Sequence, residues 1–197
     1  MPTTSTPTIP DLRPQLRGAL AQVDRLMQVA STDQAHRPTP CADFDVKTLI
    51  EHLQGVVRRL ATILSGEHFS TAPPQVASTD WAGDWRAGVT ALEPLLADDA
   101  NLDRSVEVPW GRTTGRGAIA SYVGEITVHS WDLAAAIGRT DDLDPELATT
   151  ARQSYVAILP EQPRGGAIPF GPVVPVSEDA GAYERLVAWT GRDPHWS

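Results

Sequence analysis

The residues of this chain best suited to chemistry are His52, Glu125 and His129, which together offer two imidazoles and one carboxylate. Glu125 and His129 are four residues apart, so on a helix their side chains lie one above the other on the same face. If a neighbouring helix brings His52 beside them, three ligands are in place and a fourth position stays open. That composition is typical of a catalytic zinc site, because structural zinc sites use four protein ligands.

The spacing alone is weak evidence for a metal. With 25 Asp and Glu and 5 His in 197 residues, about 0.6 pairs of this kind arise by chance at the spacing of helix neighbours. The surroundings strengthen the hypothesis, because both segments read as apolar helix and a divalent metal satisfies polar groups beside a core. The alternative from pattern alone is a surface pair of Glu125 and His129, with His52 as a core histidine bonded to a carbonyl.

The elements that must position these residues are helices, because apolar residues repeat at helical spacing over most of the chain. We predict helices over about 10–29, 45–66, 80–96, 116–138 and 144–159, and a short one over 180–189. Asp43 or Asp45 caps the second helix, which ends near Gly66, and Gly138 ends the fourth. Residues 104–117 alternate and then become turn-rich, which predicts a short extended excursion. This order predicts an antiparallel all-α bundle.

Composition narrows the class of protein. A chain of 197 residues with 41% hydrophobic residues fits one globular domain. It shows neither an apolar run of membrane-spanning length nor a signal peptide. The single cysteine, Cys41, excludes an internal disulfide and favours a cytoplasmic location. The net charge of −9 argues against nucleic acid and anionic membranes as partners, since both require clustered Lys and Arg.

Other residues are weaker candidates for the site. Asp132 could orient His129 from behind, or bind a backbone amide or a nearby arginine. Trp110 and Arg112 line the pocket if the helix over 116–138 begins at its mouth, and otherwise form an ordinary turn. Cys41 precedes a helix N-terminus, which lowers a thiol pKa and would suit a nucleophile or fourth ligand. Free cysteines are usually buried, so we expect it to pack.

Three further groups are expected to be structural. Trp131 is interpreted as bundle packing. Arg192 and Asp193, near the C-terminus, are interpreted as a structural ion pair or cap. The histidines outside the candidate site lie in loops without a helical partner and receive no role; they are His36, His68 and His195.

Several motifs resemble those of an actinobacterial metal-binding family. They are TPCADFDV with LIEHL over 39–53, EITVHSWDLA over 125–134, FGPVVPV over 170–176 and LVAWTGRDP over 186–194. They occur in the right order and cover nearly the whole chain. The chain therefore resembles the metal-binding domain family of mycothiol-dependent maleylpyruvate isomerase, within the DinB-like superfamily.

The resemblance implies a fold and a domain arrangement. The expected fold is an all-α, DinB-like antiparallel four-helix bundle with an extra helix, the extended excursion and a short C-terminal extension. Residues 1–197 then form one metal-binding domain, with the bundle core over about 10–160 and the extension over 161–197. An apolar patch over 163–176 could serve a homodimer if its residues are exposed.

The resemblance also implies a chemistry. His52, Glu125 and His129 would hold zinc, or another divalent metal such as Ni²⁺ or Fe²⁺, and mycothiol would be the co-substrate for a small electrophile. A bound cation favours the thiolate at neutral pH. No catalytic residue is assigned. Phe44 replaces the usual Trp, and the chain is too short for the isomerase's full second domain. The resemblance therefore implies thiol transfer or isomerisation by a shorter relative. The alternative is a non-catalytic metal-binding or ligand-binding module.

Overall fold

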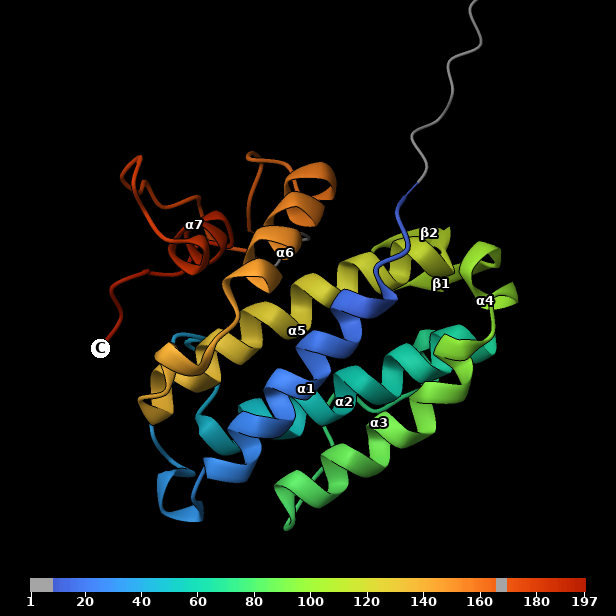
Figure 1. The fold of residues 1–197 in the computed structure, drawn as a ribbon, viewed down its shortest axis with the longest axis horizontal. Coiled ribbons are helices and arrows are strands. Elements are labelled where there is room, and N and C mark those ends of the chain that lie inside the picture. Colours follow the sequence, from blue (N-terminus) through green and yellow to red (C-terminus); the bar gives the residue numbers. More distant parts are fainter. Residues whose placement is uncertain (1–8, 166–169) are drawn as a thin grey trace, which may run out of the picture.

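The computed structural model describes residues 9–165 and 170–197, and within these ranges the fold is mostly helical (Figure 1). Seven α-helices and one two-stranded antiparallel sheet form the regular structure of the described residues. The all-α prediction is confirmed at this level. None of the described helices is long and apolar enough to cross a membrane.

Four long helices surround a shared core. They are α1 (Arg13–Val29), α2 (Val46–Ser65), α3 (Trp81–Ala97) and α5 (Gly115–Ile137). Helices α1 and α2 each contact both α3 and α5, so the four close into a ring (Figure 1). Their apolar stripes fill the interior with fully buried side chains such as Leu16, Ile50, Trp85 and Ile119. Burying one such side chain contributes about 1.5–3 kcal/mol.

The ends of the two helices that carry the candidate ligands are set by local chemistry. Helix α2 begins after Asp45, whose carboxylate accepts a hydrogen bond from the Thr48 amide at 2.8 Å. It ends at Gly66, where φ of 90° requires a residue that tolerates the left-handed region. Helix α5 begins after Thr114 and ends at Gly138 with φ of 72°. The predicted ends are confirmed, with Asp45 rather than Asp43 as the cap.

Helix α5 is buried on almost every side, because α1, α2 and α6 (Pro145–Ile158) all pack on it. Most of its buried residues are apolar or small. The exceptions include Thr127, Ser130 and Asp132, which are fully buried on this helix. Buried polar groups need partners, so the middle of α5 is where the structure must gather other polar side chains.

The predicted extended excursion is a β-hairpin. Strand β1 (Ser105–Val108) pairs with β2 (Gly111–Thr114), with Ser105 opposite Thr114 and Val108 opposite Gly111. Val106 and Val108 face the core, whereas Trp110 in the turn is 57% exposed. A short helix that the sequence did not predict, α4 (Ala100–Asp103), precedes the hairpin. With four residues it is too short to show a period.

The C-terminal segment packs on α6 through α7 (Ala182–Trp189), which also contacts α5. Gly191, with φ of 84°, lies so close to Gly171 that a Cβ at position 191 would be 2.5 Å from the Gly171 Cα. This close approach fixes the chain on either side of α7. The predicted dimer patch over 163–176 falls partly outside the described residues, because 166–169 are not described. Its role and the predicted domain division remain predictions.

Candidate metal centre and its cavity

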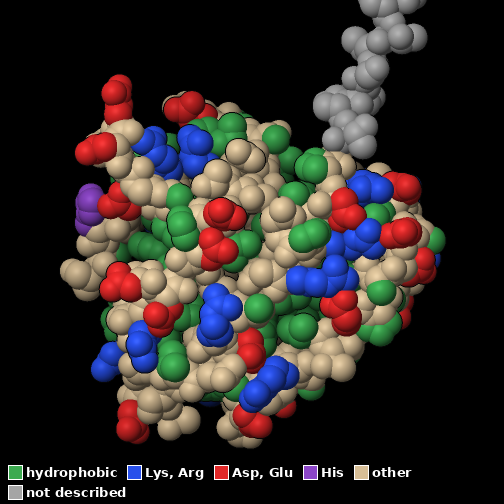
Figure 2. All heavy atoms as spheres, in the orientation of Figure 1, with side chains coloured by type: hydrophobic (Ala, Val, Ile, Leu, Met, Phe, Trp, Pro, Cys, Tyr) green, Lys and Arg blue, Asp and Glu red, His purple; other side chains and the backbone are tan. Residues whose placement is uncertain are grey.

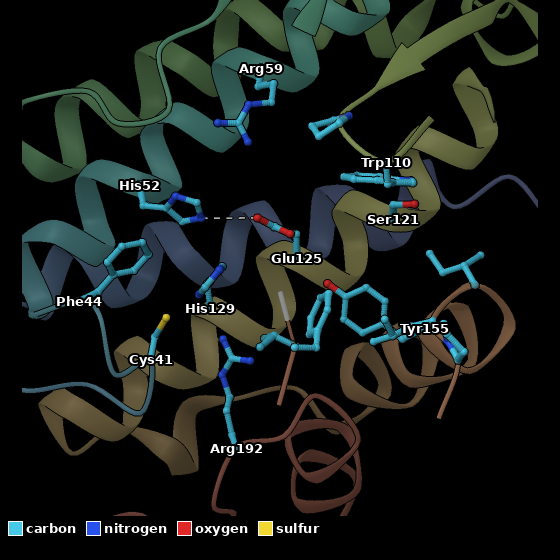
Figure 3. Close-up of a pocket in the computed structure, with 16 residues that line it drawn as sticks. Cys41, Phe44, His52, Arg59, Trp110, Ser121, Glu125, His129, Tyr155 and Arg192 are labelled. Carbon is cyan, nitrogen blue, oxygen red and sulfur yellow. Dashed lines mark ion pairs between the residues drawn. The ribbon is translucent and has the colours of Figure 1, made fainter. Parts of the chain in front are cut away.

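The three residues that the sequence singled out lie together. His52 extends from α2, and Glu125 and His129 extend from the facing side of α5 (Figure 3). One ligand atom from each lies within 4.8 Å of the others. His52 Nε2 is 3.4 Å from Glu125 Oε1, and the two imidazole centroids are 4.9 Å apart. The i,i+4 spacing on α5 and the contact between α2 and α5 therefore produce one convergent cluster.

The donor set fits a divalent metal. Two imidazole nitrogens and a carboxylate oxygen suit zinc and related first-row cations. Burial raises the pKa of Glu125, but the hydrogen bond to His52 and the charge of His129 outweigh it and lower the pKa to about 2. Glu125 is therefore ionised at neutral pH, as a ligand must be.

Asp132 fixes the orientation of His129. Its Oδ2 lies 2.9 Å from His129 Nδ1, and its side chain has no exposed surface. Because Nδ1 faces Asp132, Nε2 is the nitrogen left for a metal. A carboxylate behind a ligand histidine fixes its tautomer and raises its basicity. The hydrogen bond that the first role predicted for Asp132 requires is thus present.

The second predicted role of Asp132, binding an arginine, is observed as well. Arg192 Nε donates to Asp132 Oδ1 at 2.7 Å, and Nη2 donates to Oδ2 at 2.8 Å. Burial raises the pKa of Asp132, but the charge of Arg192 and the hydrogen bond from His129 lower it overall. Arg192 and Asp193 were expected to form a structural ion pair or a cap. Arg192 does form an ion pair, but with Asp132 and not with its neighbour, and the Asp193 carboxylate accepts a hydrogen bond from the His195 amide at 2.9 Å. Asp193 is adjacent to Arg192 in the sequence, whereas the carboxylate that needed a partner, Asp132, is buried on α5.

Cys41 lies beside this network. Its sulfur, a His129 nitrogen and an Asp132 oxygen form a second group within 4.8 Å of one another. Asp132 already accepts from Arg192 and His129, so this group is the poorer metal site. Burial, and then the charge of Asp132, raises the pKa of the Cys41 thiol to about 11. The thiol is therefore protonated at neutral pH. It is half-buried and faces the cavity, so the expected packing role holds in part.

A cavity of about 460 Å³ opens next to the cluster. Trp110 lines it, as expected, whereas Arg112 is exposed on β2 and lies outside the lining. Trp131 is buried, in agreement with a packing role. The lining residues that the sequence did not single out for the site include Arg59, Ser121, Tyr155, Phe170 and Arg192 (Figure 3).

A glycine on α5 places Tyr155 at the wall of the cavity. A Cβ at Gly124 would be 2.6 Å from two atoms of the Tyr155 ring, so only glycine lets the ring lie against α5. Phe170 packs edge-on against Tyr155, with the two ring centroids 5.6 Å apart. Burial raises the pKa of Tyr155 well above its usual value, which keeps the hydroxyl protonated as a hydrogen-bond donor. The signal in the sequence was a glycine in the middle of a helix.

Comparison with known proteins adds a family to this geometry. The family model described as the mycothiol maleylpyruvate isomerase N-terminal domain matches residues 16–134. Two uncharacterized proteins of Mycobacterium tuberculosis, from strains CDC 1551 / Oshkosh and H37Rv, are each 28% identical over 167 residues. The alignments cover 85% of this chain and 90% of each relative. No solved structure matches the chain significantly.

Proposed function

Since this chain belongs to the family of the mycothiol maleylpyruvate isomerase N-terminal domain, we propose that it is a metal-dependent enzyme acting on a low-molecular-weight thiol such as mycothiol. The proposed reaction is thiol transfer to a small electrophile, or isomerisation of it. The observation that carries the proposal is the convergence of His52, Glu125 and His129 beside an open cavity.

In this proposal His52 Nε2 or Nδ1, a Glu125 oxygen and His129 Nε2 would hold the metal, with zinc the first choice for two imidazoles and a carboxylate. When bound there, a divalent cation supplies positive charge that stabilises a thiolate at neutral pH. Three protein ligands leave room for the thiol. The structure's own thiol, Cys41, has a raised pKa, which supports an external thiol rather than Cys41 as the nucleophile.

The surrounding residues would do the remaining work. Asp132 and Arg192 hold the His129 ring in place, because their hydrogen bonds leave it one tautomer with Nε2 available. The aromatic and aliphatic walls exclude water from the electrophile, which strengthens the electrostatic interactions within the cavity. The protonated Tyr155 hydroxyl is available as a donor to an oxygen of the electrophile.

The experiment is the absorption spectrum of the cobalt(II)-substituted protein, with and without mycothiol. We expect d–d bands at one metal per chain and a new charge-transfer band when the thiol is added. His129→Ala should lose the cobalt spectrum. His68→Ala is the matched control, because His68 is a histidine in the loop after α2 and outside the cluster, and it should retain the spectrum.

The outcomes separate the parts of the proposal. A full cobalt spectrum in His129→Ala would show that the metal lies elsewhere. Cobalt bands without a thiol-dependent band would keep the metal site but reject thiol activation, leaving a metal-binding module. The absence of cobalt bands in the wild-type protein would reject the metal itself.

A further inference from the structure

Among the described residues two arginines line the cavity, Arg59 and Arg192, and only Arg192 is bonded to a carboxylate. Arg59 lies on α2, is half-buried and lines the cavity between His52 and Trp110 (Figure 3). Among the described residues no carboxylate forms an ion pair with it. Arg192, the other arginine of the cavity, is neutralised by both oxygens of Asp132. Arg59 acts on the Tyr122 hydroxyl and, through its charge, on Glu125, but neither forms an ion pair with it. Arginine is always charged, and a partly buried charge without a direct ionic partner is costly.

The position of Arg59 follows from the helix that carries His52. The two residues are seven apart, two turns of α2, so they share a face and their Cα atoms are about 10 Å apart along the axis. Arg59 is close enough to Glu125 for its charge to lower the pKa of that carboxyl, although no ion pair forms. Its guanidinium therefore belongs to the same cavity as the metal cluster.

Much of the remaining cavity wall is apolar. It combines the exposed Trp110 of the hairpin, Ile158 and Leu159 at the end of α6, and the rings of Tyr155 and Phe170. A volume of about 460 Å³ lies within the range of small-molecule sites. The cavity thus combines a polar cluster, a cation on the same helix face as His52, and an apolar wall. This combination suits an amphipathic ligand with an anionic end.

The charges lead to the same chemistry. The charges of Asp132 and Arg192 cancel. Glu125 and one thiolate would together neutralise a divalent cation at the cluster, and the charge of Arg59 would remain. One carboxylate on the electrophile would neutralise it, whereas a neutral electrophile would leave Arg59 uncompensated.

We propose that the electrophile is an apolar molecule bearing one carboxylate, bound with the carboxylate on Arg59 and its apolar body against Trp110, Ile158 and Phe170. That the ligand is the electrophile rests on the proposed function, whereas the carboxylate site itself does not require the metal. Guanidinium and carboxylate match in geometry and can form two parallel hydrogen bonds.

The test is isothermal titration calorimetry with two probes of the same shape, 4-phenylbutyrate and the neutral 4-phenylbutan-1-ol. Each is titrated into the full-length protein, both cobalt-loaded and chelator-treated. We expect wild-type protein to prefer the acid by about tenfold, the effect of one charged hydrogen-bonded pair. Arg59→Gln should remove the preference and leave alcohol binding unchanged, and Arg59→Lys should retain part of it.

Arg58→Gln is the matched control. Arg58 is the preceding residue on α2 and is exposed, so its replacement changes the net charge equally without touching the cavity. It should behave as wild type. The cobalt spectrum and the melting temperature will establish whether Arg59→Gln is folded. If it is not, the acid preference of Arg59→Lys is the measurement that tests the inference.

Two results would overturn the inference. One is an acid preference that survives in Arg59→Gln, which would place the carboxylate elsewhere; if the preference also disappears with the chelator, the anion binds the metal and the proposed function stands. The other is no preference for the acid in wild-type protein. An acid preference that depends on Arg59 in a protein that binds no cobalt would support the carboxylate site while rejecting the proposed function.

Discussion

The pair of Asp132 and Arg192 offers the sharpest test of how the C-terminal segment supports the candidate site. The Asp132 side chain is fully buried and that of Arg192 is 12% exposed, so water cannot replace the arginine as a partner. Replacing Arg192 by Met keeps much of the volume and removes the charge. Breaking a buried pair from one side costs about 3–5 kcal/mol, because the remaining charge is uncompensated. We expect the lower end of this range, since His129 still donates to Asp132.

The assay is chemical and thermal unfolding of the metal-free protein followed by circular dichroism. For a chain of this size, a loss of about 3–5 kcal/mol corresponds to a melting temperature lower by roughly 6–20 °C. The double variant Asp132→Asn with Arg192→Met should be more stable than Arg192→Met alone, because no buried charge remains. Arg17→Met is the control, since Arg17 forms an exposed pair with Glu93. Such pairs contribute at most about 1 kcal/mol.

Two results would refute this reasoning. If Arg192→Met lies within about 1 kcal/mol of wild type, the pair is no more important than an exposed one. If the double variant is no more stable than Arg192→Met, the loss comes from packing or from the rest of the segment, and not from an uncompensated Asp132.

Two further predictions concern the regions that flank the site. The pKa of each of the three tyrosines is raised, mainly by burial, and that of Tyr183 reaches about 12. The neutral rings therefore contribute stability that is complete below pH about 10, the pKa in the unfolded chain, and that is lost as the pH rises through the folded values. Absorbance at 295 nm should show tyrosinate near pH 10 in denaturant but only toward pH 12 and above in the native protein, and a native titration near pH 10 would contradict it. Gly191→Ala combines a left-handed φ of 84° with a Cβ 2.5 Å from Gly171, so it should destabilise the docking of the C-terminal segment by at least about 1–2 kcal/mol. Faster limited proteolysis after residue 160 would reveal this loss. Gly165→Ala is the control for strain alone, because Gly165 also has a positive φ but no atom lies within 4 Å of a Cβ placed there. Equal proteolysis of the two variants would count against the tight contact between Gly191 and Gly171.

The helical part of the fold was predictable because its signals are local. Apolar residues at helical spacing define α1, α2, α3 and α5. The ends of the helices that carry the candidate ligands are marked by capping residues and by glycines. Asp45 accepts the Thr48 amide, and Gly66 and Gly138 take a left-handed φ. The four-residue helix α4 has no such signal, since it is shorter than the period that would reveal it.

The candidate site was predictable in part. The spacing of Glu125 and His129 is a property of one helix, so it can be read from the sequence. The approach of His52 depends on how α2 packs on α5, which periodicity does not give. The motif resemblance supplied that step, and the structure agrees with it by bringing the ligand atoms within 4.8 Å.

Arg192 shows what local patterns cannot supply. It lies 60 residues from Asp132, next to an acidic residue that offered an easier interpretation. What decides its partner is the burial of Asp132 in the middle of α5, together with the positive φ of Gly191 just before it. The turn after α7, which contains Gly191, therefore brings Arg192 to the network behind His129.

The division of the cavity between two parts of the chain has a consequence for selectivity. Residues 16–134, which match the family model, contain all three proposed ligands as well as Arg59 and Trp110. Tyr155, Ile158 and Phe170, on the opposite wall, lie beyond that match. A metal cluster needs fixed donors, whereas an apolar wall can change with the ligand's shape while leaving those donors in place. We therefore expect substitutions at Ile158 or Phe170 to change which apolar acid binds without changing cobalt affinity, because neither residue belongs to the cluster of proposed ligands.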